Sequence, residues 1–142
     1  MELIIFVGIQ ACGKSTFFKQ QFFDTHVRIN LDTLQTRYRE KYLFQACLES
    51  KTKIVIDNTN PLKVDRLVYI EPAKRAGYEI ICYHFLSNVK DAILRNKQRT
   101  RKVPDVAIYS TAKKLQPPTY SEGFNKIFSV SDDSFNISLI QS

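Results

Sequence analysis

Short apolar runs alternate along this chain with longer segments in which apolar residues recur every three or four positions. The short runs predict five strands, at residues 3–7, 27–30, 53–57, 80–86 and 127–130. The segments between them predict helices at residues 15–23, 32–49, 61–77 and 106–115, and a further helix that begins at residue 91. Strands that alternate with helices are typical of an α/β fold. We therefore expect a mostly parallel five-stranded sheet in a three-layer arrangement, with helices on both faces.

The helix expected over residues 32–49 has an apolar face and a basic face. Its apolar positions follow helical spacing and are Leu34, Tyr38, Tyr42 and Ala46. Three cations lie on the other face: Arg37, Arg39 and Lys41. The pattern indicates one continuous amphipathic helix.

The segment 61–77 contains two prolines and ends in a glycine. Pro61 suits the first position of a helix, whereas Pro72 is expected either to kink or break that helix near Glu71 or to belong to a separate short turn. Gly77 is expected to end it. The polar tail at residues 131–142 has only a weak strand pattern, which predicts no position for it.

Size and composition narrow the class of protein. A chain of 142 residues is most simply one domain, residues 1–142. Its net charge of +7 favours a polyanionic partner, although many small basic proteins bind no nucleic acid. The three cysteines are widely spaced, which indicates neither a disulfide framework nor a zinc site and favours a reducing, cytoplasmic location. The apolar N-terminus lacks a basic leader, so we expect a core strand there rather than a signal peptide.

The strongest motif lies between the first strand and the first helix. Gly8–Ser15 matches G-x-x-x-x-G-K-S, the phosphate-binding loop (P-loop), in which glycines let successive backbone N–H groups point at one anion. The start of the helix faces the same phosphate. Lys14 can follow the transferred phosphoryl group, and the Ser15 hydroxyl suits a magnesium ion. The positions expected to contact the nucleotide are Gly8, Ala11, Cys12, Gly13, Lys14, Ser15 and Thr16.

Two carboxylates follow predicted strands. Ligands of parallel α/β sheets bind beyond the carboxyl ends of the strands, so Asp32, Asp57 and the P-loop are expected at one edge. Asp57 can hold Ser15 and magnesium-bound water, or cap an ordinary turn. Asp32 can accept the proton of an attacking hydroxyl, or serve only as the N-cap of the following helix. The residues alone leave both alternatives open.

Five cations are concentrated between residues 95 and 102. They are Arg95, Lys97, Arg99, Arg101 and Lys102. Such a run can be a solvated face. In a small kinase it can instead be a lid, here residues 95–103, that closes over ATP and brings an arginine to the phosphates. Arg99 is the first candidate for that contact, with Arg95 or Arg101 as substitutes.

With these residues assembled, the chain resembles the 5′-hydroxyl polynucleotide kinase domain, particularly the kinase half of the eukaryotic polynucleotide kinase-phosphatases. The similarity covers approximately residues 1 to 130, in the P-loop NTPase fold. Beyond the P-loop, the matching segments are Asn30–Leu34, Ile56–Pro61, Arg95–Arg99 and Pro117–Phe124. The D-N-T-N-P string within the second segment is far more selective than a P-loop.

The resemblance implies a role for each of these candidate site residues. Asp32 is expected to be the general base on the 5′-hydroxyl, and Lys14 and Ser15 to contact ATP and Mg²⁺. Asp57 is expected in the metal shell, and Arg99 as the lid arginine.

The acceptor side departs from the family at two positions. Leu31 stands where the family often has arginine, and Gln35 stands where the phage enzyme has an arginine that binds the acceptor strand. Arg37 or Arg39 can compensate. The expected acceptor-binding residues are Asp32, Gln35, Arg37 and Asn60.

The leading functional hypothesis is therefore an ATP- and Mg²⁺-dependent kinase that phosphorylates 5′-hydroxyl ends of DNA or RNA. The first alternative is a P-loop kinase of a small metabolite, nucleoside or antibiotic, which would use the same stations with a closed acceptor pocket. The second is a non-catalytic nucleotide-binding module that docks to a partner.

Overall fold

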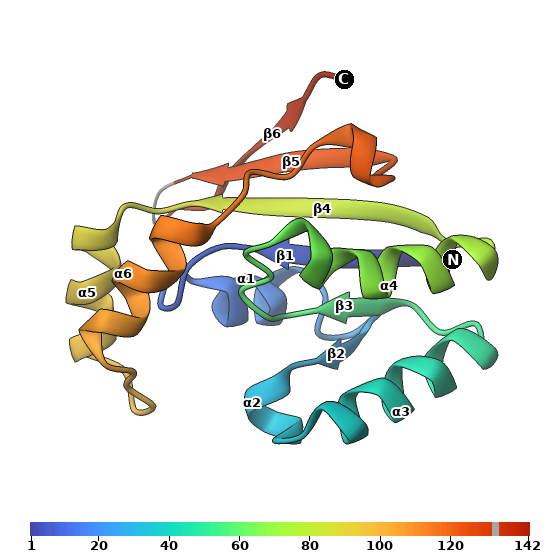
Figure 1. Cartoon of the computed structure of the whole chain (residues 1–142), viewed down its shortest axis with the longest axis horizontal. Coiled ribbons are helices and arrows are strands. Elements are labelled where there is room, and N and C mark those ends of the chain that lie inside the picture. Colours follow the sequence, from blue (N-terminus) through green and yellow to red (C-terminus); the bar gives the residue numbers. More distant parts are fainter. Residues whose placement is uncertain (132–133) are drawn as a thin grey trace.

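The five apolar runs of the sequence form one sheet in the computed structural model, which describes residues 1–131 and 134–142 (Figure 1). The strands are β1 Glu2–Val7, β2 Val27–Ile29, β3 Ile54–Ile56, β4 Glu79–Leu86, β5 Lys126–Ser131 and β6 Asn136–Ile140. Their order across the sheet is β2-β3-β1-β4-β5-β6. All neighbouring pairs are parallel except β5 and β6, which are antiparallel. The α/β prediction is thus confirmed, with a sixth strand added by the tail.

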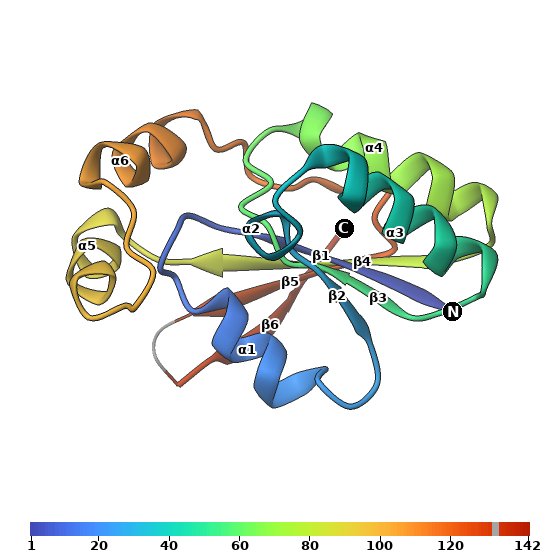
Figure 2. The same ribbon diagram turned by 90° about the horizontal axis from the view of Figure 1, so that it is seen from below.

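Helices cover both faces of this sheet. They are α1 Lys14–Gln21, α2 Leu31–Leu34, α3 Arg37–Glu49, α4 Lys63–Arg75, α5 Val89–Lys97 and α6 Asp105–Lys114, with a short 3₁₀ helix, η1, at Tyr120–Glu122. Figure 2 shows α3 and α4 on one face and α1 on the other. Among the described residues, no helix has the length and apolar content needed to cross a bilayer.

The central strand β1 explains why the sequence has apolar runs rather than alternation. Successive side chains of a strand point to opposite faces. Leu3, Ile5 and Val7 pack with residues of α3 and α4, whereas Ile4 and Phe6 pack with residues of α1, α5 and α6. Because both faces are covered, both sets must be apolar.

The segment 32–49 forms two helices, so the prediction of one continuous helix is wrong. Asn30 caps α2 by accepting a hydrogen bond from the Thr33 N–H at 3.0 Å. Thr36 caps α3 in the same way, accepting from the Arg39 N–H at 3.1 Å. Between them Gln35 has a φ of 72°, which breaks the helical path.

The break also changes which face of α3 is buried. Tyr38 and Tyr42, which the sequence pattern placed on the apolar face, are 76% and 69% exposed. The buried residues of α3 are Glu40, Phe44 and Cys47. Burial of a carboxylate within an apolar stripe requires hydrogen-bonding partners, which are described below.

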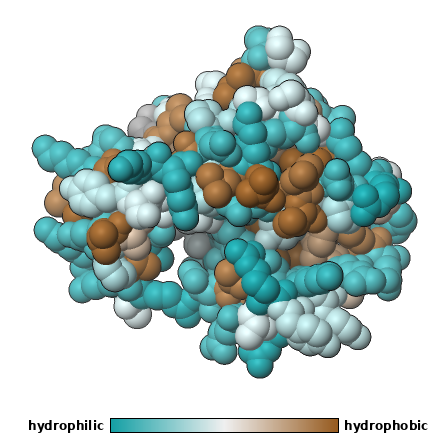
Figure 3. Space-filling model, viewed as in Figure 1, coloured by the Kyte–Doolittle hydropathy of each residue, from teal (hydrophilic) through white to brown (hydrophobic). Residues whose placement is uncertain are grey.

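Helix α4 continues through Pro72, so the helix neither breaks there nor gives way to a separate turn. The helix begins at Lys63, two residues later than Pro61, and is capped by Asp65, whose Oδ2 accepts from the Leu62 N–H at 3.1 Å. At its end Gly77 has a φ of 84°, as predicted for a terminating glycine. Figure 3 shows that apolar side chains gather on the surface over α4, where Val64 and Val68 are exposed.

The tail, which the sequence could not place, packs beside the P-loop. Strand β6 completes the sheet, and the Phe135 ring that precedes it lies 5.3 Å from the Phe17 ring of α1. A Cβ at Gly13 would lie only 3.1 Å from Phe135, and Gly13 has a φ of 97°. The backbone conformation therefore favours glycine there, and the Phe135 ring leaves little space for a larger residue. Residues 132 and 133 of the tail lie outside the described part of the chain.

Candidate active site

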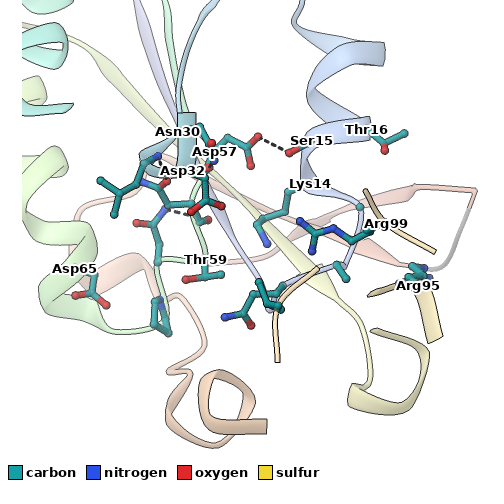
Figure 4. Close-up of a pocket in the computed structure, with 18 of the residues that line it drawn as sticks. Lys14, Ser15, Thr16, Asn30, Asp32, Asp57, Thr59, Asp65, Arg95 and Arg99 are labelled. Carbon is teal, nitrogen blue, oxygen red and sulfur yellow. Dashed lines mark hydrogen bonds between the residues drawn. The ribbon is translucent and has the colours of Figure 1, made fainter. Parts of the chain in front are cut away.

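A cavity of about 650 Å³ lies at the carboxyl ends of the strands, between the P-loop, α2 and the segment that joins α5 to α6 (Figure 4). The predicted residues that it brings together are Ala11, Gly13, Lys14, Ser15, Thr16, Asp32, Arg37, Asp57, Asn60, Arg95 and Arg99. Three predicted residues, Gly8, Cys12 and Gln35, do not line it. Segments far apart in the sequence thus meet at the sheet edge that the strand-end rule predicts.

The Lys14 side chain folds back onto the backbone of the P-loop. Lys14 Nζ donates to the carbonyl oxygens of Gly8 at 3.1 Å and Ile9 at 2.7 Å. Gly8 lies behind the loop, where a Cβ would come within 2.9 Å of Cys12 Sγ. Gly8 and Cys12 therefore shape the loop, and the Lys14 ammonium is held by two backbone carbonyls of the loop.

Ser15 and Asp57 are the two residues expected to serve a magnesium ion, and the structure joins them. Ser15 Oγ donates to Asp57 Oδ2 at 3.0 Å, and Asp57 is only 1% exposed. A hydroxyl and a carboxylate are oxygen donors of the kind that Mg²⁺ prefers, alongside phosphate oxygens and water. The residues present fit this ion.

An arginine that the sequence did not single out also contacts this pair. Arg28, on β2, donates from Nε to Asp57 Oδ2 at 2.7 Å and from Nη2 to Ser15 Oγ at 2.9 Å. The buried carboxylate therefore already has a cation supplied by the chain. A metal ion at these oxygens has to share Asp57 with Arg28 or displace it.

We expect Arg28→Met to lower the free energy of unfolding of the metal-free protein by about 1–3 kcal/mol, because the buried Asp57 carboxylate loses its cation. Added Mg²⁺ should then raise the melting temperature of the variant more than that of the wild type, since the same carboxylate needs a counter-charge. Thermal unfolding in EDTA and across a Mg²⁺ titration measures both effects. Arg75→Met, at the exposed end of α4, is the matched control. An equal Mg²⁺ response in wild type and Arg28→Met would contradict competition between the two cations.

A hydrogen-bond network fixes the short helix that carries Asp32. Asn58 Oδ1 accepts from the Leu31 N–H at 2.9 Å, and Asn30 Nδ2 donates to the Asp57 carbonyl at 2.6 Å. These bonds tie α2 to the end of β3. Because Asn30 is the N-cap, the alternative in which Asp32 is only a cap is wrong; Asp32 lies in the first turn, exposed to the cavity.

The buried Glu40 supports this network from α3. Its Oε2 accepts from Asn58 Nδ2 at 2.8 Å, and its Oε1 accepts from the Tyr69 hydroxyl at 2.8 Å. Burial raises the pKa of Tyr69, and the Glu40 carboxylate raises it further, so the phenol stays protonated and continues to donate. Glu40 therefore holds Asn58, and through it α2, in place.

The basic segment after α5 closes one side of the cavity. Asn96 holds its two ends together, donating from Nδ2 to the Val103 carbonyl at 2.6 Å and accepting from the Val103 N–H at 3.1 Å. Arg99 lines the cavity, and its buried Nη1 has no hydrogen-bond partner among the described residues. Arg95 lines the cavity too and donates to Ser87 Oγ at 3.1 Å. An inward-facing guanidinium with an unused donor suits an anionic ligand.

A buried ion pair anchors the loop at Asn60, which lines the cavity. Arg66 is fully buried and pairs with Glu122, Nε to Oε1 at 2.7 Å and Nη2 to Oε2 at 3.0 Å. Its Nη1 also donates to the carbonyls of Asn60 at 3.0 Å and Gln116 at 2.9 Å. Asn60 in turn uses its side-chain amide to bond the Phe6 carbonyl at 2.8 Å. Asn60 thus lines the cavity from a loop that these hydrogen bonds hold in place, and its side-chain amide already donates to a backbone carbonyl of the protein.

Gln35 takes no part in the cavity, contrary to the expectation for an acceptor-binding residue. It lies at the break between α2 and α3, where its Oε1 accepts from Arg39 Nη1 at 3.5 Å. Arg37 does line the cavity, and its Nη1 pairs with Glu40 Oε1 at 2.8 Å. Of these two residues, Arg37 lines the cavity and Gln35 does not.

The model of a family described as an AAA domain matches residues 3–118. The chain belongs to this family. The resemblance to polynucleotide kinases is also confirmed. This chain is 30% identical over 132 residues to the bifunctional polynucleotide phosphatase/kinase of Schizosaccharomyces pombe. The match covers 89% of this chain and 32% of the relative.

The chain is also similar to proteins named for other activities. The L-seryl-tRNA(Sec) kinase of Methanococcus maripaludis is 25% identical over 136 residues, covering 82% of this chain and 53% of the relative. The chain therefore spans about a third to a half of the length of these relatives. The structure of Chaetomium thermophilum Kti12 in complex with ADP-AlF3 has a TM-score of 0.76 at 17% identity, covering 92% of this chain and 89% of that chain. That likeness confirms the P-loop fold.

Proposed function

We propose that this chain is an ATP- and Mg²⁺-dependent kinase that transfers the γ-phosphate of ATP to the 5′-hydroxyl end of DNA or RNA. One observation carries the chemistry: Asp32 lies in the same cavity as Lys14 and Arg99, on the opposite side from them (Figure 4). The similarity to a polynucleotide phosphatase/kinase and the net charge of +7 favour a nucleic acid as the acceptor.

In the proposed reaction the P-loop N–H groups and Lys14 hold the phosphates of ATP. Ser15 and Asp57 would hold the magnesium ion. When bound, Mg²⁺ would neutralise charge on the phosphates of ATP. Asp32 accepts the proton of the 5′-hydroxyl as that oxygen attacks the γ-phosphorus. The bond from the γ-phosphorus to the bridging oxygen breaks, ADP leaves, and Arg99 stabilises the charge that develops on the transferred group.

A second acceptor class is favoured by one specific match. The M. maripaludis relative is a kinase of L-seryl-tRNA(Sec), so a related chain acts on a different hydroxyl. The same residues of this cavity, Lys14, Asp32 and Arg99, would serve the phosphorylation of such an acceptor or of a small metabolite. The difference between the candidates lies in the acceptor, and the experiment must therefore vary the acceptor.

We also propose that residues 1–142 act as one P-loop kinase domain, with residues 95–103 as its lid. The three cysteines are free and buried, which fits the reducing conditions of the cytoplasm.

The proposed function is tested by competition between acceptors. Purified protein, ATP and Mg²⁺ are incubated with a 5′-hydroxyl oligonucleotide, in the absence and presence of an excess of seryl-tRNA, nucleosides and sugars. The proposal predicts oligonucleotide phosphorylation that the small hydroxyl compounds do not suppress. Preferential phosphorylation of seryl-tRNA or of a small compound would overturn it. Slow ATP turnover that no acceptor stimulates, together with tight nucleotide binding, would instead indicate a non-catalytic module.

A further inference from the structure

The first two turns of α3 expose aromatic and basic side chains together. Tyr38 and Tyr42 are 76% and 69% exposed, and their ring centroids lie 6.2 Å apart with the planes tilted by 34°. The cations exposed beside them are Arg37, Arg39 and Lys41. We call these five residues the α3 surface.

The tyrosines of the α3 surface contribute little to the core. The helix is held by Phe44 and Cys47 on its buried face, where Phe44 packs edge-on against Tyr69 at 5.4 Å. Tyr38 and Tyr42 follow one another by one helical turn on the opposite side. Two large rings left in water on one face, between cations, are not explained by the packing of the fold.

The α3 surface is continuous with the cavity. Arg37, its first residue, lines the cavity that also contains Asp32. Arg39 reaches back to the end of α2, donating from Nη1 to the Leu34 carbonyl at 3.3 Å. The surface therefore begins at the mouth of the cavity, on the side where the acceptor hydroxyl is expected.

This combination of groups suits one kind of partner. Exposed aromatic rings stack on the faces of unpaired bases, and interspersed cations track the phosphates of the same strand. The α4 surface offers a contrast: its exposed residues Val64, Leu67 and Val68 are aliphatic and provide no ring for a base (Figure 3). A base inside a duplex is already stacked on its neighbours, so an exposed ring is of most use to a single strand.

We propose that the α3 surface binds the single-stranded segment that follows the acceptor 5′ end. The bases of that segment stack on Tyr38 and Tyr42, and its phosphates meet Arg37, Arg39 and Lys41. This inference rests on the proposed function, because it places the acceptor end beside Asp32. It adds that the acceptor is single-stranded near its end. It also gives the cations of α3 the role that arginines at positions 31 and 35 would have, where this chain has Leu31 and Gln35.

The test removes the rings and keeps the cations. The variants are Tyr38→Leu/Tyr42→Leu, the conservative Tyr38→Phe/Tyr42→Phe, and Tyr109→Leu, a control at a tyrosine that is 57% exposed on α6. Fluorescence anisotropy without ATP measures binding of a labelled single-stranded 5′-hydroxyl oligonucleotide of about 15 nucleotides, compared with a blunt duplex. We expect the Leu double variant to bind the single strand about 10- to 100-fold more weakly, whereas the Phe double variant and Tyr109→Leu bind as the wild type does.

Phosphate transfer provides the second measurement. For the long single strand the Leu double variant should raise KM with kcat unchanged, since stacking holds the strand before and during transfer alike. For an acceptor shorter than about 4 nucleotides, KM should not change, because such a strand does not extend along α3.

The outcomes separate the two proposals. Unchanged single-strand binding in the Leu double variant, or an equal loss in the Phe double variant, would overturn base stacking on the α3 surface. A loss as large for the blunt duplex would overturn the preference for a single strand. If wild-type protein phosphorylates no oligonucleotide but does phosphorylate a small acceptor, the proposed function fails, and the inference that depends on it is overturned as well.

Discussion

Asp32→Asn is expected to slow phosphate transfer to a 5′-hydroxyl by about 10²- to 10⁴-fold, because it removes the group that accepts the hydroxyl proton. ATP affinity should be unchanged, since the P-loop and Lys14 are separate from α2. The asparagine keeps the size of the side chain, and the cap of α2 is Asn30, so the helix should remain formed. Single-turnover kinetics measures the transfer rate, and equilibrium nucleotide binding on the same preparation measures the ATP affinity.

A matched acid away from the cavity provides the control. Asp24→Asn removes one exposed carboxylate from the loop before β2 and should leave transfer at the wild-type rate. If Asp32→Asn keeps its transfer rate within about tenfold of the wild type, Asp32 is not the general base.

Glu122→Gln is expected to have the largest effect on stability. It leaves the fully buried Arg66 guanidinium without its anion, and the loss of one partner of a buried pair costs about 3–5 kcal/mol. For a chain of this size the melting temperature should fall by roughly 10 °C or more. Urea unfolding monitored by circular dichroism measures the free energy directly.

The double replacement Arg66→Met/Glu122→Leu separates the charge effect from the loss of packing. Because it removes both charges, it should be more stable than Glu122→Gln, although the Asn60 and Gln116 carbonyls lose their donor. A Glu122→Gln variant that loses less than about 1 kcal/mol would show that Arg66 is satisfied by the backbone carbonyls alone.

Local patterns were sufficient to predict five of the six strands and the P-loop. The central strands β1 and β3 are buried on both faces, so each appears in the sequence as an uninterrupted apolar run, as Leu3–Val7 does. The P-loop is defined by residues that are adjacent in sequence, and the strand-end rule then places Asp32 and Asp57 beside it.

The remaining features depend on contacts between residues distant in sequence. Glu40 is buried within a basic segment, where it pairs with the neighbouring Arg37 but also accepts hydrogen bonds from Tyr69 and Asn58, neither of which is near it in the chain. Arg66 and Glu122 are 56 positions apart. No spacing rule links two charged residues so far apart in the sequence.

Arg28 was missed for the same reason. In a strand of three residues, one polar side chain between two apolar ones indicates only a partly exposed strand. Its contact with both Ser15 and Asp57 depends on the neighbouring position of β2 and β3 in the sheet, which the sequence does not specify.

The central claim is that this cavity delivers the γ-phosphate of ATP to a 5′-hydroxyl, and one measurement tests it most directly. The protein is incubated with ATP labelled in the γ-phosphate and with two oligonucleotides of identical sequence, one with a 5′-hydroxyl and one with a 5′-phosphate. After digestion to mononucleotides, we expect the label only in the 5′-terminal nucleotide of the first oligonucleotide, as a monoester. Absence of label from the 5′-hydroxyl strand, or equal labelling of both strands, would contradict the proposed function.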